Sequence, residues 1–170
     1  MTENRWRVLP LTTERTRALA DCHIACWREA YRDLVPAHVL AAFDIDRRAE
    51  AWERIRANNP DAIVIALADD LVIGFACGGP ARDDSPVAAR ELNAMYVRAA
   101  WYGTGLAHDL MRAVLDPEVD TSLWVFEQNP RAQTFYRKYG FELDGTHRTE
   151  AFTPAVEVRM IRRAEFSSRR

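Results

Sequence analysis

The stretch Met95-Tyr96-Val97-Arg98-Ala99-Ala100-Trp101-Tyr102-Gly103-Thr104-Gly105-Leu106-Ala107 predicts a β-strand that passes through a glycine turn into an α-helix. Gly103 and Gly105 allow positive φ and a close approach of a ligand to the backbone. The first amides of the following helix lack acceptors within it, and the helix dipole favours an anion. The stretch therefore predicts a phosphate site, with a ligand-free turn as the alternative.

Other glycine-loop motifs do not match this turn. A dinucleotide fingerprint that opens at Gly103 needs glycine at position 108, where His108 stands. A triphosphate loop needs Gly-Lys-Ser/Thr, and the only lysine, Lys138, lies elsewhere. We expect His108 on the polar side of the helix, in solvent or beside the phosphate. The apolar side recurs at helical spacing and is formed by Leu106, Ala107, Leu110, Met111 and Val114.

A second strand followed by a helix is predicted by Trp124-Val125-Phe126-Glu127-Gln128-Asn129-Pro130-Arg131-Ala132-Gln133-Thr134-Phe135-Tyr136-Arg137-Lys138-Tyr139-Gly140-Phe141. Asn129 suits the helix cap and Pro130 the first helical position. Gly140 suits the C′ position at the far end. Tyr136 falls on an apolar stripe, so the residues alone favour a core aromatic there.

The rest of the pattern predicts an α/β fold with a mixed, mostly antiparallel sheet flanked by helices. Asp69-Asp70 predicts a hairpin, and no linker divides residues 1–170, which we expect to form one domain with a frayed tail at 167–170. We expect strands at 5–11, 62–68, 71–77, 91–97, 121–126, 141–151 and 155–161, helices at 12–31, from Pro36 and at 45–57, and a long loop at 78–90.

Composition limits the functional classes. The chain has 170 residues, with 23 Lys plus Arg against 25 Asp plus Glu, and this balance argues against a nucleic-acid partner. No apolar run approaches the roughly 20 residues that cross a bilayer, and the N-terminus does not resemble a signal peptide. We therefore expect a cytoplasmic protein with no membrane partner. Three cysteines without metal-ligand spacing predict buried structural thiols and no metal site, and they are Cys22, Cys26 and Cys77.

The segment 96–107 resembles motif A of the GNAT N-acetyltransferase superfamily, Gln/Arg-x-x-Gly-x-Gly/Ala after the fourth strand. Gly105 and Ala107 match the small positions, and Tyr102 departs from the family's Gln or Arg. The segment 124–141 resembles motif B of the same family. A weaker similarity is the helix Trp27-Arg28-Glu29-Ala30-Tyr31. Two motifs in this order are more specific than either alone.

The resemblance implies a GNAT-like fold in which strands four and five splay apart, leaving a wedge for acetyl-CoA between Val97 and Trp124. It implies an acetyl-CoA-dependent N-acetyltransferase that moves the acetyl group by direct attack in a ternary complex. The acceptor is a primary amine of a small molecule or peptide, and a homodimer is left open. The alternative is a noncatalytic acyl-CoA-binding or sensing module. The implied acetyl-CoA-binding residues are Met95, Tyr96, Val97, Tyr102, Gly103, Thr104, Gly105, Leu106, Ala107, His108, Asn129 and Tyr136.

The catalytic roles also follow from the resemblance. Tyr136 matches the motif B tyrosine, which implies a general acid that protonates the departing thiolate. Glu91, at the start of the fourth strand, is the candidate base, directly or through water, with a solvated glutamate as the alternative. A backbone amide near Met95 or Tyr96 is the candidate oxyanion donor. His147 either lines the acceptor pocket or lies on an exposed strand. Other carboxylates left open as the base are Glu29, Glu127 and Glu150.

Overall fold

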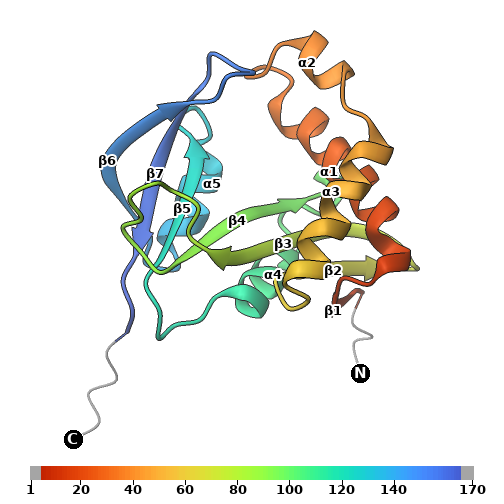
Figure 1. Ribbon diagram of the computed structural model, residues 1–170, viewed down its shortest axis with the longest axis horizontal. Coiled ribbons are helices and arrows are strands. Elements are labelled where there is room, and N and C mark those ends of the chain that lie inside the picture. The colour runs from red at the N-terminus through yellow and green to blue at the C-terminus, as the bar shows by residue number, and fades with distance from the viewer. Residues whose placement is uncertain (1–4, 166–170) are drawn as a thin grey trace, which may run out of the picture. The chain divides into compact units, whose positions relative to one another are not determined.

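A computed structural model describes residues 5–165, and its strands pair in the order β1-β2-β3-β4-β5-β7-β6 (Figure 1). The β1–β2, β2–β3, β5–β7 and β6–β7 pairs are antiparallel, whereas β4 and β5 are parallel at Arg90↔Thr121 and Glu91↔Ser122. This confirms the predicted mixed, mostly antiparallel sheet, while the splay of the two parallel strands stays a prediction. The strands are β1 Arg7–Pro10, β2 Ile63–Ala68, β3 Leu71–Pro80, β4 Arg90–Val97, β5 Thr121–Phe126, β6 Glu142–Thr149 and β7 Val156–Arg162.

The helices follow the predicted positions closely. The short helix α2 begins directly after Pro36, where a helix was predicted to open, and α3 ends at Asn58, where the Asn-Asn-Pro-Asp run begins. The α-helices are α1 Thr16–Tyr31, α2 Ala37–Ala41, α3 Ile45–Asn58, α4 Leu106–Val114 and α5 Pro130–Arg137, and short 3₁₀ turns are η1 Thr13–Arg15 and η2 Ala99–Trp101.

Contacts within the chain group it into two compact units that interleave along the sequence. Unit 1 contains residues 5–77 and 94–114 of the described chain, and unit 2 contains 78–93 and 115–165. Each unit therefore holds part of β4, with the division after Asn93. The prediction of one domain stays a prediction.

Unit 1 has a hydrophobic core on each face of its strands, because alternate residues of a strand point to opposite faces. On one face, Ile63 and Ile65 of β2 pack with α1 and α3, which lie side by side (Figure 1). On the other face, Ala66 and Ala68 pack with α4. Helices thus cover both faces, and most residues of β2 and β3 between them are buried.

Two details of unit 1 show why particular residues are needed. Asp69 and Asp70 have φ of 46° and 63°, the paired left-handed conformation of a two-residue hairpin turn, so the predicted hairpin is confirmed. Gly74 of β3 lies so close to β4 that an added Cβ would be 2.9 Å from the carbonyl oxygen of Tyr96. The absence of a side chain at Gly74 therefore lets β4 lie as close to β3 as it does.

Unit 2 is built around β5, which pairs with β7, and α5 is fastened to the end of β5. The buried Gln133 side chain donates from Nε2 to the carbonyl oxygens of Phe126 and Glu127, at 3.2 and 2.9 Å. These bonds satisfy carbonyl groups where the strand ends. The apolar core of the unit includes Leu123, Val125, Phe141, Val158 and Met160.

Several local predictions were wrong in detail. The helix predicted at 12–31 begins with the 3₁₀ turn η1 and becomes α-helical only at Thr16, and the Thr12 hydroxyl before it makes no capping hydrogen bond. The long loop starts after Pro80, because β3 continues past Cys77. The glycine at the end of α5 is confirmed, however: Gly140 has a φ of 86°, its amide donates to the carbonyl oxygen of Arg137 at 3.0 Å, and the amide of Phe141 donates to that of Tyr136 at 3.3 Å, the bonds expected around a C′ glycine. The tail at 167–170 lies outside the described residues.

The three cysteines are buried and free, as predicted. Cys22 and Cys26 face each other on α1 with their sulfur atoms 3.9 Å apart. The Cys22 thiol and burial together raise the pKa of Cys26 above its ordinary value. That keeps the Cys26 sulfur protonated and unreactive, as expected of a structural thiol.

Candidate functional site

The predicted glycine turn lies in unit 1, between η2 and α4. Gly103 and Gly105 have φ of 74° and 95°, in the left-handed region that glycine enters without strain. A Cβ added at either position would meet no atom within 4 Å among the residues 5–165. The turn therefore presents bare backbone, with room for a ligand to come close.

Several amides of this turn are left without a protein partner. The Thr104 hydroxyl donates to the carbonyl oxygen of Trp101 at 2.7 Å and accepts from the amide of Leu106 at 3.4 Å. The carbonyl oxygen of Gly105 accepts from the amides of His108 and Asp109, at 3.1 and 3.3 Å. Within the described chain, four amides donate to no protein acceptor, those of Gly103, Thr104, Gly105 and Ala107. Such a set fits a phosphate or pyrophosphate oxygen.

Trp6, in the N-terminal segment, contacts residues on both sides of the glycine turn. The Trp6 and Trp101 rings meet edge to face with centroids 5.9 Å apart. The Trp6 Nε1 donates to the Asp109 carboxylate at 2.9 Å, which fastens the same tryptophan to α4. Sequence reasoning missed Trp6, and its separation of 103 residues from Asp109 left no local signal.

Glu29 joins α1 to the start of the turn. Its carboxylate accepts from Arg98 Nε at 2.9 Å and from the amide of Ala99 at 2.7 Å. Although burial opposes the shift, these two hydrogen bonds lower the pKa of Glu29. The glutamate of the weaker N-terminal motif is thus already engaged by two donors.

Strand β4 presents alternate side chains to the two faces of unit 1. Met95 and Val97 pack on the α4 side, and Tyr96 packs on the side of α1 and α3. The Tyr31 and Tyr96 hydroxyl oxygens are 3.4 Å apart, and the Trp27 and Tyr31 ring centroids are 4.9 Å apart. The N-terminal motif and the strand before the glycine turn therefore meet through the rings of Trp27, Tyr31 and Tyr96.

In unit 2, motif B forms the predicted strand, cap and helix. Asn129 Oδ1 accepts from the amide of Ala132 at 3.3 Å, and Pro130 occupies the first position of α5. Tyr136 is buried, with 9% of its surface exposed. Its ring lies 5.7 Å from that of Phe135 and 6.0 Å from that of Phe141, centroid to centroid. Both the core contact and the cap predicted from the residues are confirmed.

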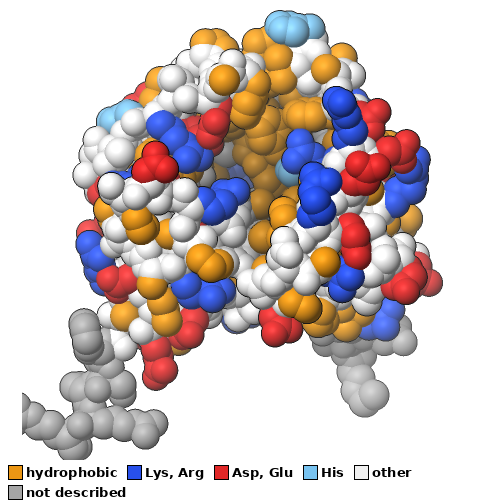
Figure 2. Space-filling view, viewed as in Figure 1, with side chains coloured by type: hydrophobic (Ala, Val, Ile, Leu, Met, Phe, Trp, Pro, Cys, Tyr) orange, Lys and Arg blue, Asp and Glu red, His pale blue; other side chains and the backbone are white. Residues whose placement is uncertain are grey.

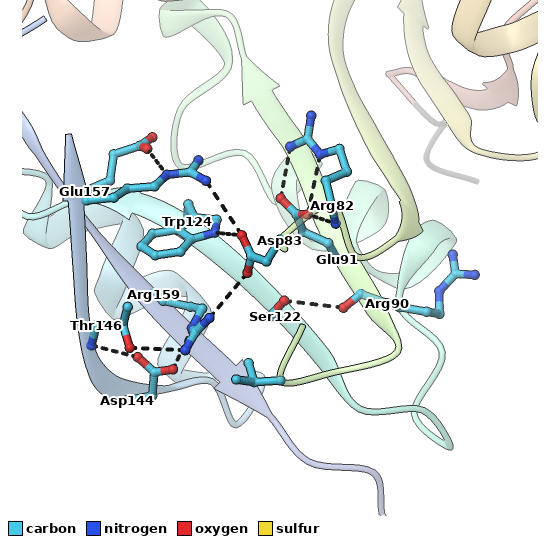
Figure 3. Close-up of polar contacts among 12 residues, drawn as sticks. Arg82, Asp83, Arg90, Glu91, Ser122, Trp124, Asp144, Thr146, Glu157 and Arg159 are labelled. Atoms are coloured by element: carbon cyan, nitrogen blue, oxygen red, sulfur yellow. Dashed lines mark hydrogen bonds and ion pairs between the residues drawn. The ribbon is translucent and has the colours of Figure 1, made fainter. Parts of the chain in front are cut away.

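Glu91 lies in unit 2 at the second residue of β4 and is buried, with 2% exposure. One carboxylate oxygen accepts from the Arg82 backbone amide at 3.0 Å, and the other accepts from its Nη2 at 2.9 Å (Figure 3). A third contact, from Arg82 Nε, measures 3.4 Å. The candidate base is therefore held in place by one residue of the 81–89 loop.

The same loop anchors a charged network over β5 and β7 in unit 2. The Asp83 carboxylate accepts from Trp124 Nε1 at 3.0 Å and from Arg159 at 3.3 Å (Figure 3). Arg148 stacks 4.1 Å above the Trp124 ring and binds Glu157 at 2.7 Å. Burial raises the pKa of Glu157 despite that bond. Sequence reasoning missed Asp83, because a solvated loop aspartate has the same local pattern.

His147 is exposed on β6, as one of its two predicted alternatives required. Its Nε2 lies 3.4 Å from the Glu127 carboxylate.

Most predicted cofactor residues, from Met95 to His108, belong to unit 1, whereas Glu91, Asn129 and Tyr136 belong to unit 2. Within residues 5–165 no group of three or more His, Cys, Asp or Glu side chains could hold a metal ion, and no helix combines the length and hydropathy that a membrane span requires.

Comparisons with known proteins agree with this geometry. A family model described as an acetyltransferase (GNAT) domain matches residues 59–143. An uncharacterised N-acetyltransferase of Mycobacterium bovis is 31% identical over 120 residues, which cover 66% of this chain and 73% of the relative.

Two solved structures share the fold at low sequence identity. The PaiA N-acetyltransferase of Thermoplasma acidophilum, in complex with coenzyme A, has a TM-score of 0.68 at 18% identity, covering 93% of this chain and 98% of its own. Arabidopsis thaliana Naa50, bound to a bisubstrate analogue, has a TM-score of 0.64 at 16% identity, covering 94% and 99%.

Proposed function

Because the chain belongs to the GNAT acetyltransferase family, we propose that it transfers an acetyl group from acetyl-CoA to a primary amine by direct attack in a ternary complex. The observation that carries this proposal is the row of unpartnered amides in the open glycine turn of unit 1. Acetyl-CoA supplies an activated thioester and a pyrophosphate. Four free amides at a helix N-terminus suit the second of these.

The proposed hold on the donor is made chiefly by backbone. Gly103, Thr104, Gly105 and Ala107 offer their amides, and Leu106 buries its side chain to anchor the start of α4. The departure at Tyr102 is then tolerable, because a side chain at that position adds to a backbone site and does not create it. His108, near the start of the same helix, is proposed to lie beside the phosphates.

Tyr136 is the proposed general acid. As the amine nitrogen forms its bond to the acetyl carbon, the carbon–sulfur bond breaks and the sulfur needs a proton, which the phenol hydroxyl supplies. The Phe135 and Phe141 rings fix the orientation of the Tyr136 ring. Asn129, which caps the same helix, is proposed to contact the donor as well.

Glu91 is the proposed route for the proton that the amine loses. Arg82 occupies three acceptor directions of the carboxylate, and a carboxylate offers about four. One direction is left for a water molecule, so Glu91 acts through water and not by touching the amine. The oxyanion donor is proposed to be a backbone amide of Met95 or Tyr96.

The test of this mechanism is Tyr136→Phe, which removes one hydroxyl and keeps the ring contacts. We expect the single-turnover rate of acetyl transfer to fall on the order of 10²-fold, because positioned acid catalysis contributes about that much. Binding of acetyl-CoA, measured by calorimetry, should change little, and Phe135→Leu serves as a packing control. An unchanged single-turnover rate would return Tyr136 to a core role.

The departure at Tyr102 favours one alternative, a noncatalytic acyl-CoA-binding module. Thiol release from acetyl-CoA with a broad panel of amines, together with thermal stabilisation by CoA, separates the two functions. Stabilisation without turnover of any amine would support the module. Turnover of any one amine would exclude it.

A further inference from the structure

Arg48 of α3 has a guanidinium group that no carboxylate neutralises. It makes no ion pair among residues 5–165, whereas Arg17 of α1 pairs with Asp46 and Arg56 of α3 pairs with Glu53. Its Cζ lies 5.8 Å from the centroid of the Phe43 ring, and its charge acts on His23. An unpaired cation thus lies beside the half-buried ring of Phe43 among the described residues.

The cluster itself is only partly covered. We define the aromatic cluster as the rings of His23, Trp27, Phe43 and Tyr96, all of which are half-buried. Trp27 lies 5.5 Å from Phe43 and 6.4 Å from Tyr96, and His23 lies 5.3 Å from Tyr96, centroid to centroid. Figure 2 shows hydrophobic side chains gathered over α1 and α2 in this unit. By contrast, the core aromatic Phe75, whose ring centroid is 5.1 Å from that of His23, is fully buried.

The carboxylates around the cluster are already engaged. Glu29 is bound by Arg98 and the amide of Ala99, and Asp44 caps α3 by accepting from the amide of Arg47 at 2.8 Å. Arg28, next to Trp27, donates to a carbonyl oxygen and adds a second cation. This surface of unit 1 therefore favours an anion and is unsuited to a polycation.

His23 contributes a neutral ring. Burial, with a smaller contribution from Arg48, lowers the pKa of His23 to about 3. Its Nδ1 is buried without a hydrogen-bond partner among the described residues. At neutral pH the imidazole is therefore an uncharged part of the aromatic surface, and Arg48 is the cation that faces it.

Resting on the proposed function, we propose that the acceptor is a primary amine carrying both an aromatic ring and a carboxylate, as in an aromatic amino acid. The ring packs on the aromatic cluster, and the carboxylate binds Arg48. Tyr96 belongs both to this cluster and to the strand that leads into the glycine turn, so acceptor and donor sites share one strand. The amine nitrogen bonds to the acetyl carbon, loses one proton, and yields an N-acetylated acid and free CoA thiol.

The experiment compares phenylalanine with phenethylamine, which lacks the carboxylate, with alanine, which lacks the ring, and with spermidine. We expect phenylalanine to have the highest kcat/KM, by about tenfold or more over each of the others, since a bond to a charged group is worth about 1.5–3 kcal/mol. Calorimetric titration of phenylalanine and phenethylamine provides a readout independent of turnover and should give the same order.

Arg48→Met then tests the residue. It should lower kcat/KM for phenylalanine by about 10- to 100-fold and leave phenethylamine within about threefold. Arg47→Met, a matched change at the neighbouring exposed arginine, should leave both substrates unchanged. Equal losses for phenylalanine and phenethylamine in Arg48→Met would overturn the assignment.

The outcomes separate this inference from the function on which it rests. Turnover of spermidine or alanine in preference to phenylalanine would overturn the acceptor class and leave the acetyltransferase proposal standing. No thiol release with any amine, in protein that CoA stabilises, would instead overturn the proposed activity.

Discussion

The N-termini of α4 and α5 begin after similar signals in the sequence but differ in how their amides are satisfied. At α5, Asn129 accepts from the amide of Ala132, and Pro130 has no amide hydrogen to satisfy. At α4 the preceding residues are Gly103, Thr104 and Gly105, and their amides have no acceptor among residues 5–165. The start of α5 is thus capped by its own chain, whereas at α4 the Thr104 hydroxyl reaches only the amide of Leu106, at 3.4 Å, and the three preceding amides stay open.

The difference has a physical reason. The side-chain oxygen of a cap residue accepts a hydrogen bond from an amide of the first helical turn. That hydrogen bond contributes about 1 kcal/mol of stability. Gly103 and Gly105 have no side chain that could accept these bonds, so the amides remain available to a ligand. We infer that α4 is specialised for binding an anion and that α5 is specialised for holding Tyr136 in place.

Closing the open helix start should have the largest effect. Gly105→Val should weaken CoA binding by at least about 1.4 kcal/mol, tenfold in affinity, because its Cβ would project into the space above the free amides. Gly145→Val is the matched control, since Gly145 has a φ of 86° and equally open surroundings in β6. Calorimetry on both folded variants measures the effect. Equal CoA affinity in the two would remove the phosphate assignment.

Opening the closed helix start should have a smaller effect. Asn129→Ala should lower the free energy of unfolding by about 1 kcal/mol through loss of the cap, measured by urea denaturation. Asn129→Asp keeps the capping oxygen and should keep stability, but it adds a negative charge. If Asn129 also contacts the donor, the aspartate variant should bind CoA more weakly at low salt. CoA affinity equal to that of the parent would confine Asn129 to capping.

Restoring the family residue at position 102 should have the smallest effect. Tyr102→Gln should leave CoA affinity within a few fold, because Tyr102 is 38% exposed and the proposed grip is made by backbone amides. The same calorimetric titration measures it. A large gain in affinity would instead show that the parent chain is a weakened binder, and it would favour the noncatalytic module.

The sequence predicted those parts of the fold that depend on neighbouring residues. The hairpin at Asp69-Asp70 and the Asn129–Pro130 cap follow from local conformational preferences, and both are present. The end of β3 was misplaced because Gly78 and Gly79 suggest a loop, whereas β3 continues through them to Pro80. A neighbouring strand can supply the backbone partners that the local pattern does not anticipate.

The candidate site likewise contains residues that the sequence alone predicts and partners that only the folded chain reveals. Gly103, Gly105 and the strand before them could be recognised from residue type and spacing alone. The partners that fix the site could not, since Trp6 with Asp109 and Glu29 with Arg98 are separated by 103 and 69 residues. A glutamate or tryptophan has the same local pattern whether it is solvated or bound. Only the folded chain shows that these side chains already have partners.

By itself, the sequence determined the order of strands and helices, the bare backbone of the glycine turn, the α5 cap and the family. These depend on steric limits and periodicities that act over a few residues. Tertiary structure decided that Arg82 holds Glu91 and that Asp83 joins Trp124 to Arg159. It also decided that Arg48, beside the aromatic cluster, has no ion pair with any of residues 5–165. Those outcomes depend on charges and rings brought together from distant segments, and their energies exist only once folding has removed water from between them.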